Sequence, residues 1–158
     1  MSIINQNLGS TVKAKKGAKI AIAVSRYNRE ITSALLESCK KELIKRGVLR
    51  NNIDVTEVPG AFELVYACKK FVDLNKYDAV IALGAVIRGE TPHFDFIALS
   101  VSHGIMELNL ENKIPVIFGV LTTENLKQAR DRIKGGKRGD KAAEAAITAI
   151  EMINLKIN

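Results

Sequence analysis

Four short apolar runs, each followed by a segment with helical spacing, constrain the fold of this chain more than any other feature. The runs cover residues 20–24, 53–58, 79–87 and 116–121. The first, third and fourth are almost continuously apolar, which is typical of strands covered on both faces of a parallel sheet. We therefore predict that the runs form strands.

Apolar residues with helical spacing separate and follow these runs. One predicted helix covers residues 31–43 and ends at Gly47, where a left-handed cap is favourable. Others pass through residues 62–72, 97–108, 126–133 and 143–153, and Thr122 or Thr123 should cap the short one at 126–133. Strands that alternate with helices favour right-handed crossovers. The predicted fold is α/β: a three-layer α/β/α sandwich around a four-stranded parallel sheet, of flavodoxin-like type.

The chain has the size of one domain, and we expect residues 1–158 to form a single unit. Residues 1–17 lack a helical pattern and should be mobile or packed on a neighbouring subunit. No run of eighteen apolar residues and no export signal is present, so we expect a cytoplasmic protein without a membrane partner. Cys39 and Cys68 lie within helical apolar patterns, which favours buried thiols over a disulfide or a metal site.

A net charge of +7 favours an anionic partner, either a phosphorylated metabolite or nucleic acid. The lysines are scattered and lack the interleaved aromatic residues of a stacking surface, which argues against nucleic acid. No glycine-rich dinucleotide motif, Walker-type motif or cluster of histidine and cysteine ligands occurs in the sequence. We therefore predict neither a cofactor nor a metal.

Ligands of open parallel sheets bind beyond the carboxyl ends of the strands. The segments that follow the four runs, 25–28, 59–63, 88–93 and 122–125, are rich in polar residues and glycines. In the third segment, His93 lies at a predicted helix amino terminus, where amide groups can hold an anion and an imidazole can move protons. The alternative is that His93 only caps or packs against that helix.

Several other side chains have two interpretations. Tyr27 and Asn28 could stack on a heterocycle and recognise its edge, or Tyr27 could be a partly exposed core residue. Phe62 and Phe118 have the same ambiguity, and core packing is the better expectation for Phe62. Arg132, in the basic stretch 130–141, could bind a phosphate through its guanidinium or belong to a solvated mobile loop.

Three motifs resemble those of one enzyme family, the lumazine synthases: VPGAFE at 58–63, GAVIRGETPHFD at 84–95 and FGVLTTEN at 118–125. The resemblance extends from about Lys19 to Ile153. It implies condensation of 5-amino-6-(D-ribitylamino)uracil with 3,4-dihydroxy-2-butanone 4-phosphate, giving 6,7-dimethyl-8-ribityllumazine, phosphate and water, without cofactor or metal. Two competing functions are a flavodoxin-like binding module and a shell protein whose site has decayed.

The resemblance also implies roles for individual residues. His93 would move protons. The phosphate would bind to Gly89, Glu90, Thr91 and Arg132. The pyrimidine and its ribityl chain would bind to Tyr27, Asn28, Gly60, Ala61, Phe62, Glu63, Val86, Ile87 and Phe118.

Family members are oligomeric, so the resemblance implies a homopentamer or a sixty-subunit capsid, with riboflavin synthase as a possible further partner. Phe118, Arg132 and a lysine of the late loop would then come from the adjacent chain. Two departures from the family pattern are present. Tyr27 replaces a phenylalanine found in many members. The loop is one residue longer than usual, so either Lys141 or Lys137 could take the role of the family lysine.

Overall fold

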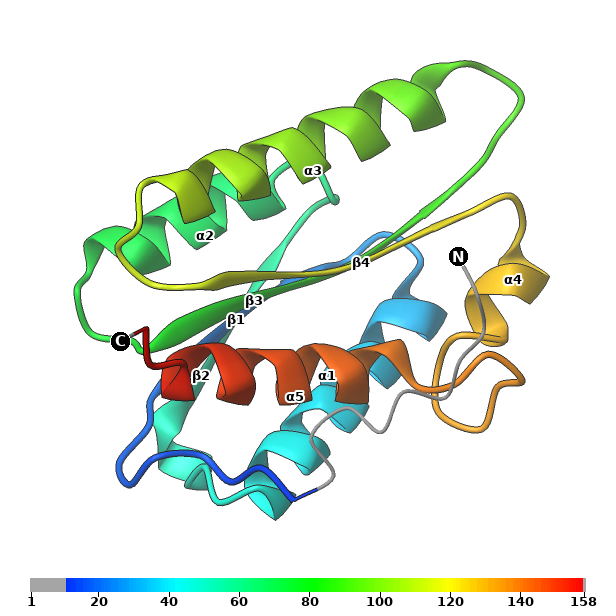
Figure 1. Ribbon diagram of the computed structural model, residues 1–158. Helices are drawn as coiled ribbons and strands as arrows, with labels where there is room; N and C mark the ends of the chain where they lie inside the picture. The colour runs from blue at the N-terminus through cyan, green and yellow to red at the C-terminus, as the bar shows by residue number, and fades with distance from the viewer. Residues whose placement is uncertain (1–10, 158) are drawn as a thin grey trace.

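The structure, a computed structural model, describes residues 11–157 and contains a parallel sheet of four strands with helices on both faces (Figure 1). The strands are β1 (Ile20–Ser25), β2 (Ile53–Val58), β3 (Ala79–Ile87) and β4 (Val116–Thr123). Their order in the sheet is β2-β1-β3-β4, and every pair is parallel. This arrangement confirms the predicted three-layer sandwich of flavodoxin-like type.

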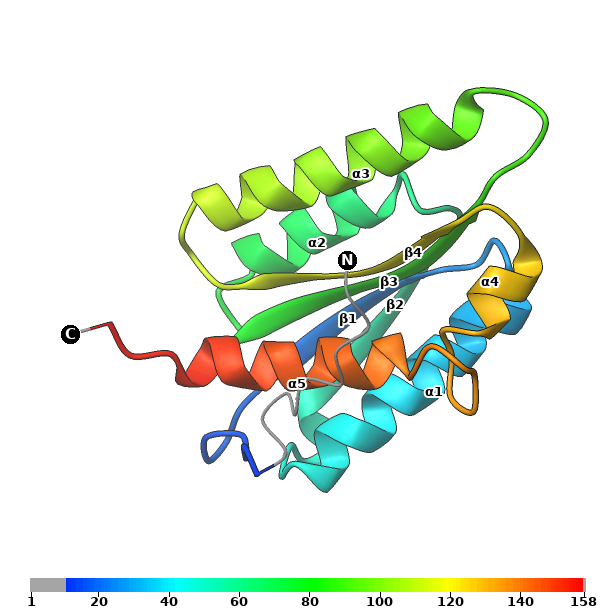
Figure 2. The same cartoon turned by 45° about the vertical axis from the view of Figure 1, so that its right-hand side comes forward.

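Helices cover both faces of the sheet (Figures 1 and 2). On one face α1 (Arg29–Lys45) and α5 (Lys141–Asn154) enclose a core with Ile20, Ile22, Ile81 and Leu83. On the other face α2 (Leu64–Asp73) and α3 (His93–Leu110) pack over Ala21, Ala23, Val80 and Ala82. Successive residues of a strand point to opposite faces, so the apolar β1 and β3 can fill both cores.

The short elements differ from the predictions in two ways. Thr122 and Thr123 do not cap a helix, because both belong to β4; Asn125 caps α4 (Leu126–Arg130) by accepting a hydrogen bond from the Gln128 backbone. The helix α4 also ends at Arg130, before Ile133, and the glycine-containing loop follows it directly. A 3₁₀ turn at Arg50–Asn52 precedes β2. Gly47 does take a positive φ after α1, as predicted.

The two cysteines are free and buried, as predicted. Burial raises the pKa of the Cys39 thiol and of the Cys68 thiol to about 12, so both are protonated and packed as small apolar side chains at neutral pH. Within residues 11–157 no group of three or more histidine, cysteine or carboxylate side chains could hold a metal ion. No helix in the same range is long and apolar enough to cross a bilayer.

Candidate active site

The loops that leave β1 and β2 are bonded to each other at the carboxyl edge of the sheet. The backbone N–H of Arg26 donates to the carbonyl of Val58 at 2.8 Å, and that of Tyr27 donates to Pro59 at 3.1 Å. These bonds continue the strand pairing beyond β1. They fix the backbone of Tyr27 while its side chain is 71% exposed. The interpretation of Tyr27 as a core aromatic is therefore wrong, and its ring is accessible to a ligand.

Asn28 lies at the start of α1 in a left-handed conformation, with φ 57° and ψ 47°. Its carbonyl accepts the first helical bonds from Ile31 and Thr32, and its side-chain Nδ2 donates to the carbonyl of Ala85 at 2.8 Å. Asparagine tolerates this backbone conformation better than most residues. The bond to β3 holds the amide at the strand end, beside the residues Val86 and Ile87 that were predicted to share its role.

The β2–α2 loop brings Gly60 and Glu63 against Tyr27. The backbone N–H of Gly60 donates to Glu63 Oε2 at 2.8 Å. A Cβ on Gly60 would lie 3.0 Å from that oxygen and 3.0 Å from the Tyr27 ring, so a larger residue would have to displace one of these side chains. Ala61 beside them is buried. Tyr27, Asn28, Gly60 and Glu63 thus form one cluster at the carboxyl ends of β1, β2 and β3.

Phe62 in the same loop is 56% exposed. Core packing was expected for it because it continues the apolar spacing of the following helix, and this expectation is wrong. The helix begins at Leu64, so Phe62 lies in the preceding turn and its side chain does not share the buried face of α2.

The β3–α3 loop places Gly89, Glu90, Thr91 and His93 on the surface at the same edge. His93 is the first residue of α3, as predicted, and its side chain is exposed. The Asp95 carboxylate in the first turn pairs with the Arg88 guanidinium, which holds the pKa of Asp95 below its usual range. The helix amino terminus and the exposed loop backbone together suit an anion.

The basic loop after α4 is bonded to itself. Its ends meet where the Lys141 N–H donates to the Arg132 carbonyl at 3.0 Å, and Arg138 N–H donates to Asp131 at 2.7 Å. A Cβ on Gly136 would lie 2.5 Å from backbone atoms of Arg130 and Asp131, so this closure requires glycine. The half-buried Arg132 donates from Nη1 to the Gln128 carbonyl at 2.9 Å. Arg132 therefore does not belong to an unstructured loop.

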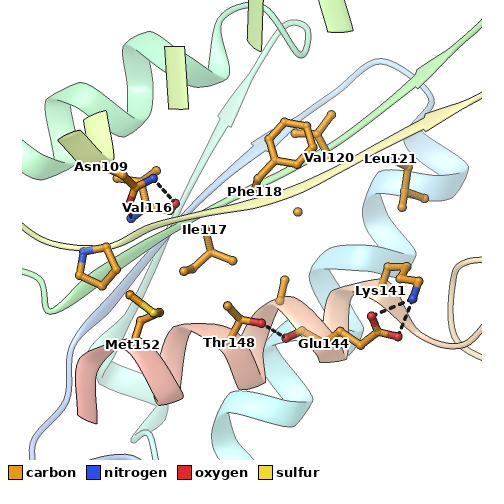
Figure 3. Close-up of a pocket in the computed structure, with 13 residues that line it drawn as sticks. Asn109, Val116, Ile117, Phe118, Val120, Leu121, Lys141, Glu144, Thr148 and Met152 are labelled. Atoms are coloured by element: carbon orange, nitrogen blue, oxygen red, sulfur yellow. Dashed lines mark hydrogen bonds and ion pairs between the residues drawn. The ribbon is translucent and has the colours of Figure 1, made fainter. Parts of the chain in front are cut away.

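Phe118 is not part of the carboxyl-edge cluster of its own chain. Phe118 pairs with Ala82, five residues before Thr123 pairs with Ile87, and so lies about 16 Å from the end of β4. Phe118 and Lys141 both line a hollow of about 520 Å³ along the edge strand β4. Figure 3 shows Phe118 on the side of β4 away from α5, and Lys141 on the α5 side, bonded to Glu144. Phe118 is 42% exposed on this edge strand.

Sequence reasoning identified the exposed residues at the carboxyl edge, but not the ion pairs and hydrogen bonds that hold the surrounding elements together. Arg88 bridges Asp95 and Glu124, and Asp140 accepts a hydrogen bond from the Ser38 hydroxyl of α1. Arg88 stands within a motif that was identified, but nothing in the sequence indicated which carboxylates it would meet. Ser38 and Asp140 are 102 residues apart and gave no signal.

The fold, with exposed polar and aromatic groups at this edge, is typical of flavodoxin-like α/β proteins, a class that binds small molecules at the carboxyl ends of the strands. The family model of 6,7-dimethyl-8-ribityllumazine synthase matches residues 17–157, and the chain belongs to this family. Its members are transferases of riboflavin biosynthesis, so the chain condenses 5-amino-6-(D-ribitylamino)uracil with 3,4-dihydroxy-2-butanone 4-phosphate. The family acts on small molecules and is oligomeric. The predicted family and reaction are confirmed.

Proposed function

We propose that the carboxyl-edge cluster is the site of this condensation and that Tyr27 carries the pyrimidine on its ring. The exposed ring, which lies close to Gly60, offers a flat surface for stacking. Asn28 and the backbone of Val86 and Ile87 read the edge of the heterocycle. The remaining residues of the pyrimidine and ribityl subsite are Ala61, Phe62 and Glu63, with the Glu63 carboxylate accepting bonds from the ribityl hydroxyls.

The butanone phosphate lies, in this proposal, over the loop between β3 and α3. Gly89, Glu90 and Thr91 supply backbone and hydroxyl donors, and the dipole of the eighteen-residue α3 favours the anion. Arg132 adds a planar pair of donors that matches two phosphate oxygens. The exposed positions of the three loop residues and the ordered path of the basic loop support this arrangement.

His93 moves protons between the intermediates. The amine of the uracil adds to the ketone carbonyl, and the resulting carbinolamine loses water to give an imine. Loss of phosphate and ring closure follow, with further loss of water. Each step needs a proton at one atom and releases one at another, which suits an imidazole at the edge of both subsites. The reactants already condense slowly in water, so most of the acceleration comes from holding them in register.

The site is completed, in this proposal, by the adjacent chain of a homopentamer, either free or as part of a sixty-subunit capsid. Phe118, Arg132 and Lys141, or Lys137 in place of Lys141, come from that neighbour. The position of Phe118 supports this, because it is exposed on an edge strand about 16 Å from the carboxyl edge of its own sheet. We also propose a cytoplasmic location, a single domain over residues 1–158 and riboflavin synthase as a partner.

A direct test mixes the purified chain with both substrates in the presence of a chelator. Lumazine fluorescence and released phosphate should rise together above the uncatalysed background. A metal or nucleotide requirement would contradict the mechanism. A protein that binds the substrates without accelerating either signal would be a binding module, and one that assembles without turnover would be a decayed shell protein.

A further inference from the structure

Arg88 occupies the junction between the β3–α3 loop and the β4–α4 loop. Its backbone N–H donates to the Thr123 carbonyl at 2.9 Å, which continues the pairing of β3 with β4 by one residue. Its side chain then turns across both loops and is 35% exposed. The backbone of Arg88 therefore ties the start of the β3–α3 loop to the last residue of β4.

The guanidinium of Arg88 uses three of its nitrogen atoms and one of its faces. Nη1 and Nη2 each donate to an oxygen of Asp95 at 2.9 Å, and Nε donates to Glu124 Oε2 at 2.7 Å. The Phe94 ring lies under the guanidinium carbon at 4.2 Å. A planar group with fixed donors holds its partners in defined directions, unlike a flexible ammonium. Asp95 and Phe94 flank each other in the first turn of α3, directly after His93.

Through Glu124, the bonds of Arg88 extend to α4 and to Arg132, which follows α4. The backbone N–H of Glu124 donates to Gln128 Oε1 at 3.0 Å, and the carbonyl of Gln128 accepts the bond from Arg132 Nη1 at 2.9 Å. A continuous path of bonded groups thus joins Arg88, which directly precedes the 89–91 loop of its own site, to Arg132, which in the proposed pentamer serves the adjacent site.

We propose that Arg88 is a positioning residue, which fixes the start of α3 relative to the β4–α4 loop. It thereby holds in place the 89–91 loop and His93 of its own site, and also Arg132, which in the proposed pentamer serves the site of the adjacent chain. This inference rests on the proposed function for the assignment of those groups. Arg88 does not contact substrate in this account. Its two carboxylate partners neutralise its charge, so the cation offered to the phosphate is the Arg132 of the adjacent chain.

The test compares Arg88→Met with Lys69→Met. Lys69 is a matched control because it also bridges two carboxylates, Asp73 and Glu111, at a similar side-chain exposure of 38%. It does so at the opposite end of α3. Asp95→Asn and Arg88→Lys are the second and third variants, and they keep the proposal testable if Arg88→Met does not fold.

Three measurements are made on each assembled variant: amide hydrogen exchange of residues 95–100 in the first turns of α3, where the amides are hydrogen-bonded, affinity for inorganic phosphate, and the Michaelis constants of both substrates. Arg88→Met should lose protection at 95–100 and weaken phosphate and butanone phosphate binding by about three- to thirtyfold. The constant for the uracil should change by less than about twofold. Arg88→Lys should retain only part of the wild-type protection and phosphate affinity, because an ammonium cannot hold both carboxylates in a plane. Lys69→Met should match the wild type in all three.

Equal behaviour of Arg88→Met and Lys69→Met in exchange and phosphate affinity would overturn the proposal. So would an equal rise in both Michaelis constants for Arg88→Met, because that indicates general disturbance of the fold. Absence of turnover by the wild-type chain would contradict the proposed function instead, and exchange and phosphate binding would still decide the role of Arg88.

Discussion

Replacing Asp140 with alanine should destabilise the folded chain by about 2–4 kcal/mol, because one carboxylate supports two elements. Its Oδ1 caps α5 by accepting bonds from the Ala142 and Ala143 backbones at 3.2 and 3.1 Å. Its Oδ2 accepts from the hydroxyl of Ser38, a buried residue of α1. Loss of a cap costs about 1 kcal/mol, and loss of a hydrogen bond to a charged group about 1.5–3 kcal/mol.

The control is Asn125→Ala, which removes the single capping bond of α4 and no bond to a distant helix. It should cost about 1 kcal/mol. Ser38→Ala tests the other half of the contact, and the double variant with Asp140→Ala gives the coupling energy. We expect a coupling of about 1–2 kcal/mol, within the range for directly bonded groups.

Urea unfolding at one fixed protein concentration measures these differences, because subunit association adds to apparent stability. A dual role of Asp140 would be refuted if Asp140→Ala cost no more stability than Asn125→Ala, or if the effects of the substitutions at 38 and 140 were additive. Asp140 also ends the loop whose Lys141 N–H bonds to the Arg132 carbonyl, so Asp140→Ala should weaken phosphate binding as well.

Three further outcomes are expected. Arg132→Ala should raise the Michaelis constant of the butanone phosphate by about ten- to a hundredfold and leave that of the uracil within about twofold, and equal rises would remove its specific role. His93→Ala should slow turnover by about ten- to a thousandfold in single-turnover assays while substrate binding persists, whereas near-normal turnover would make His93 a structural residue. Light scattering should show at least a pentamer, and active monomers would exclude a site shared between chains.

The layers of the fold could be predicted from the sequence because burial on both faces leaves a direct pattern. The apolar run at 79–87 became β3 with unchanged bounds, and 20–24 became β1 with Ser25 added. Helix ends were harder to predict. Thr123 and Asn125 are both good caps by type, and the choice depended on how far β4 continued its pairing with β3.

The positions of the expected site residues in the fold could be predicted from the sequence because these residues follow the strands directly. Tyr27, Asn28 and Glu63 do lie together at one edge, as the parallel order requires. The contacts that hold them could not be predicted. The carboxylate partners of Arg88 depend on the three-dimensional path of the loops. The exposure of Phe62 depends on the residue at which α2 begins.

The central claim is that a catalytic site takes His93 from one chain and Arg132 from its neighbour. Co-expression of His93→Ala and Arg132→Ala chains in equal amounts, with a different tag on each, yields mixed oligomers for assay. Random mixing places an intact pair at about a quarter of the interfaces. We predict that mixed oligomers recover about a quarter of the wild-type activity per chain, well above either variant alone. Activity equal to the mean of the two separate variants would contradict the claim, because each chain would then contain its whole site.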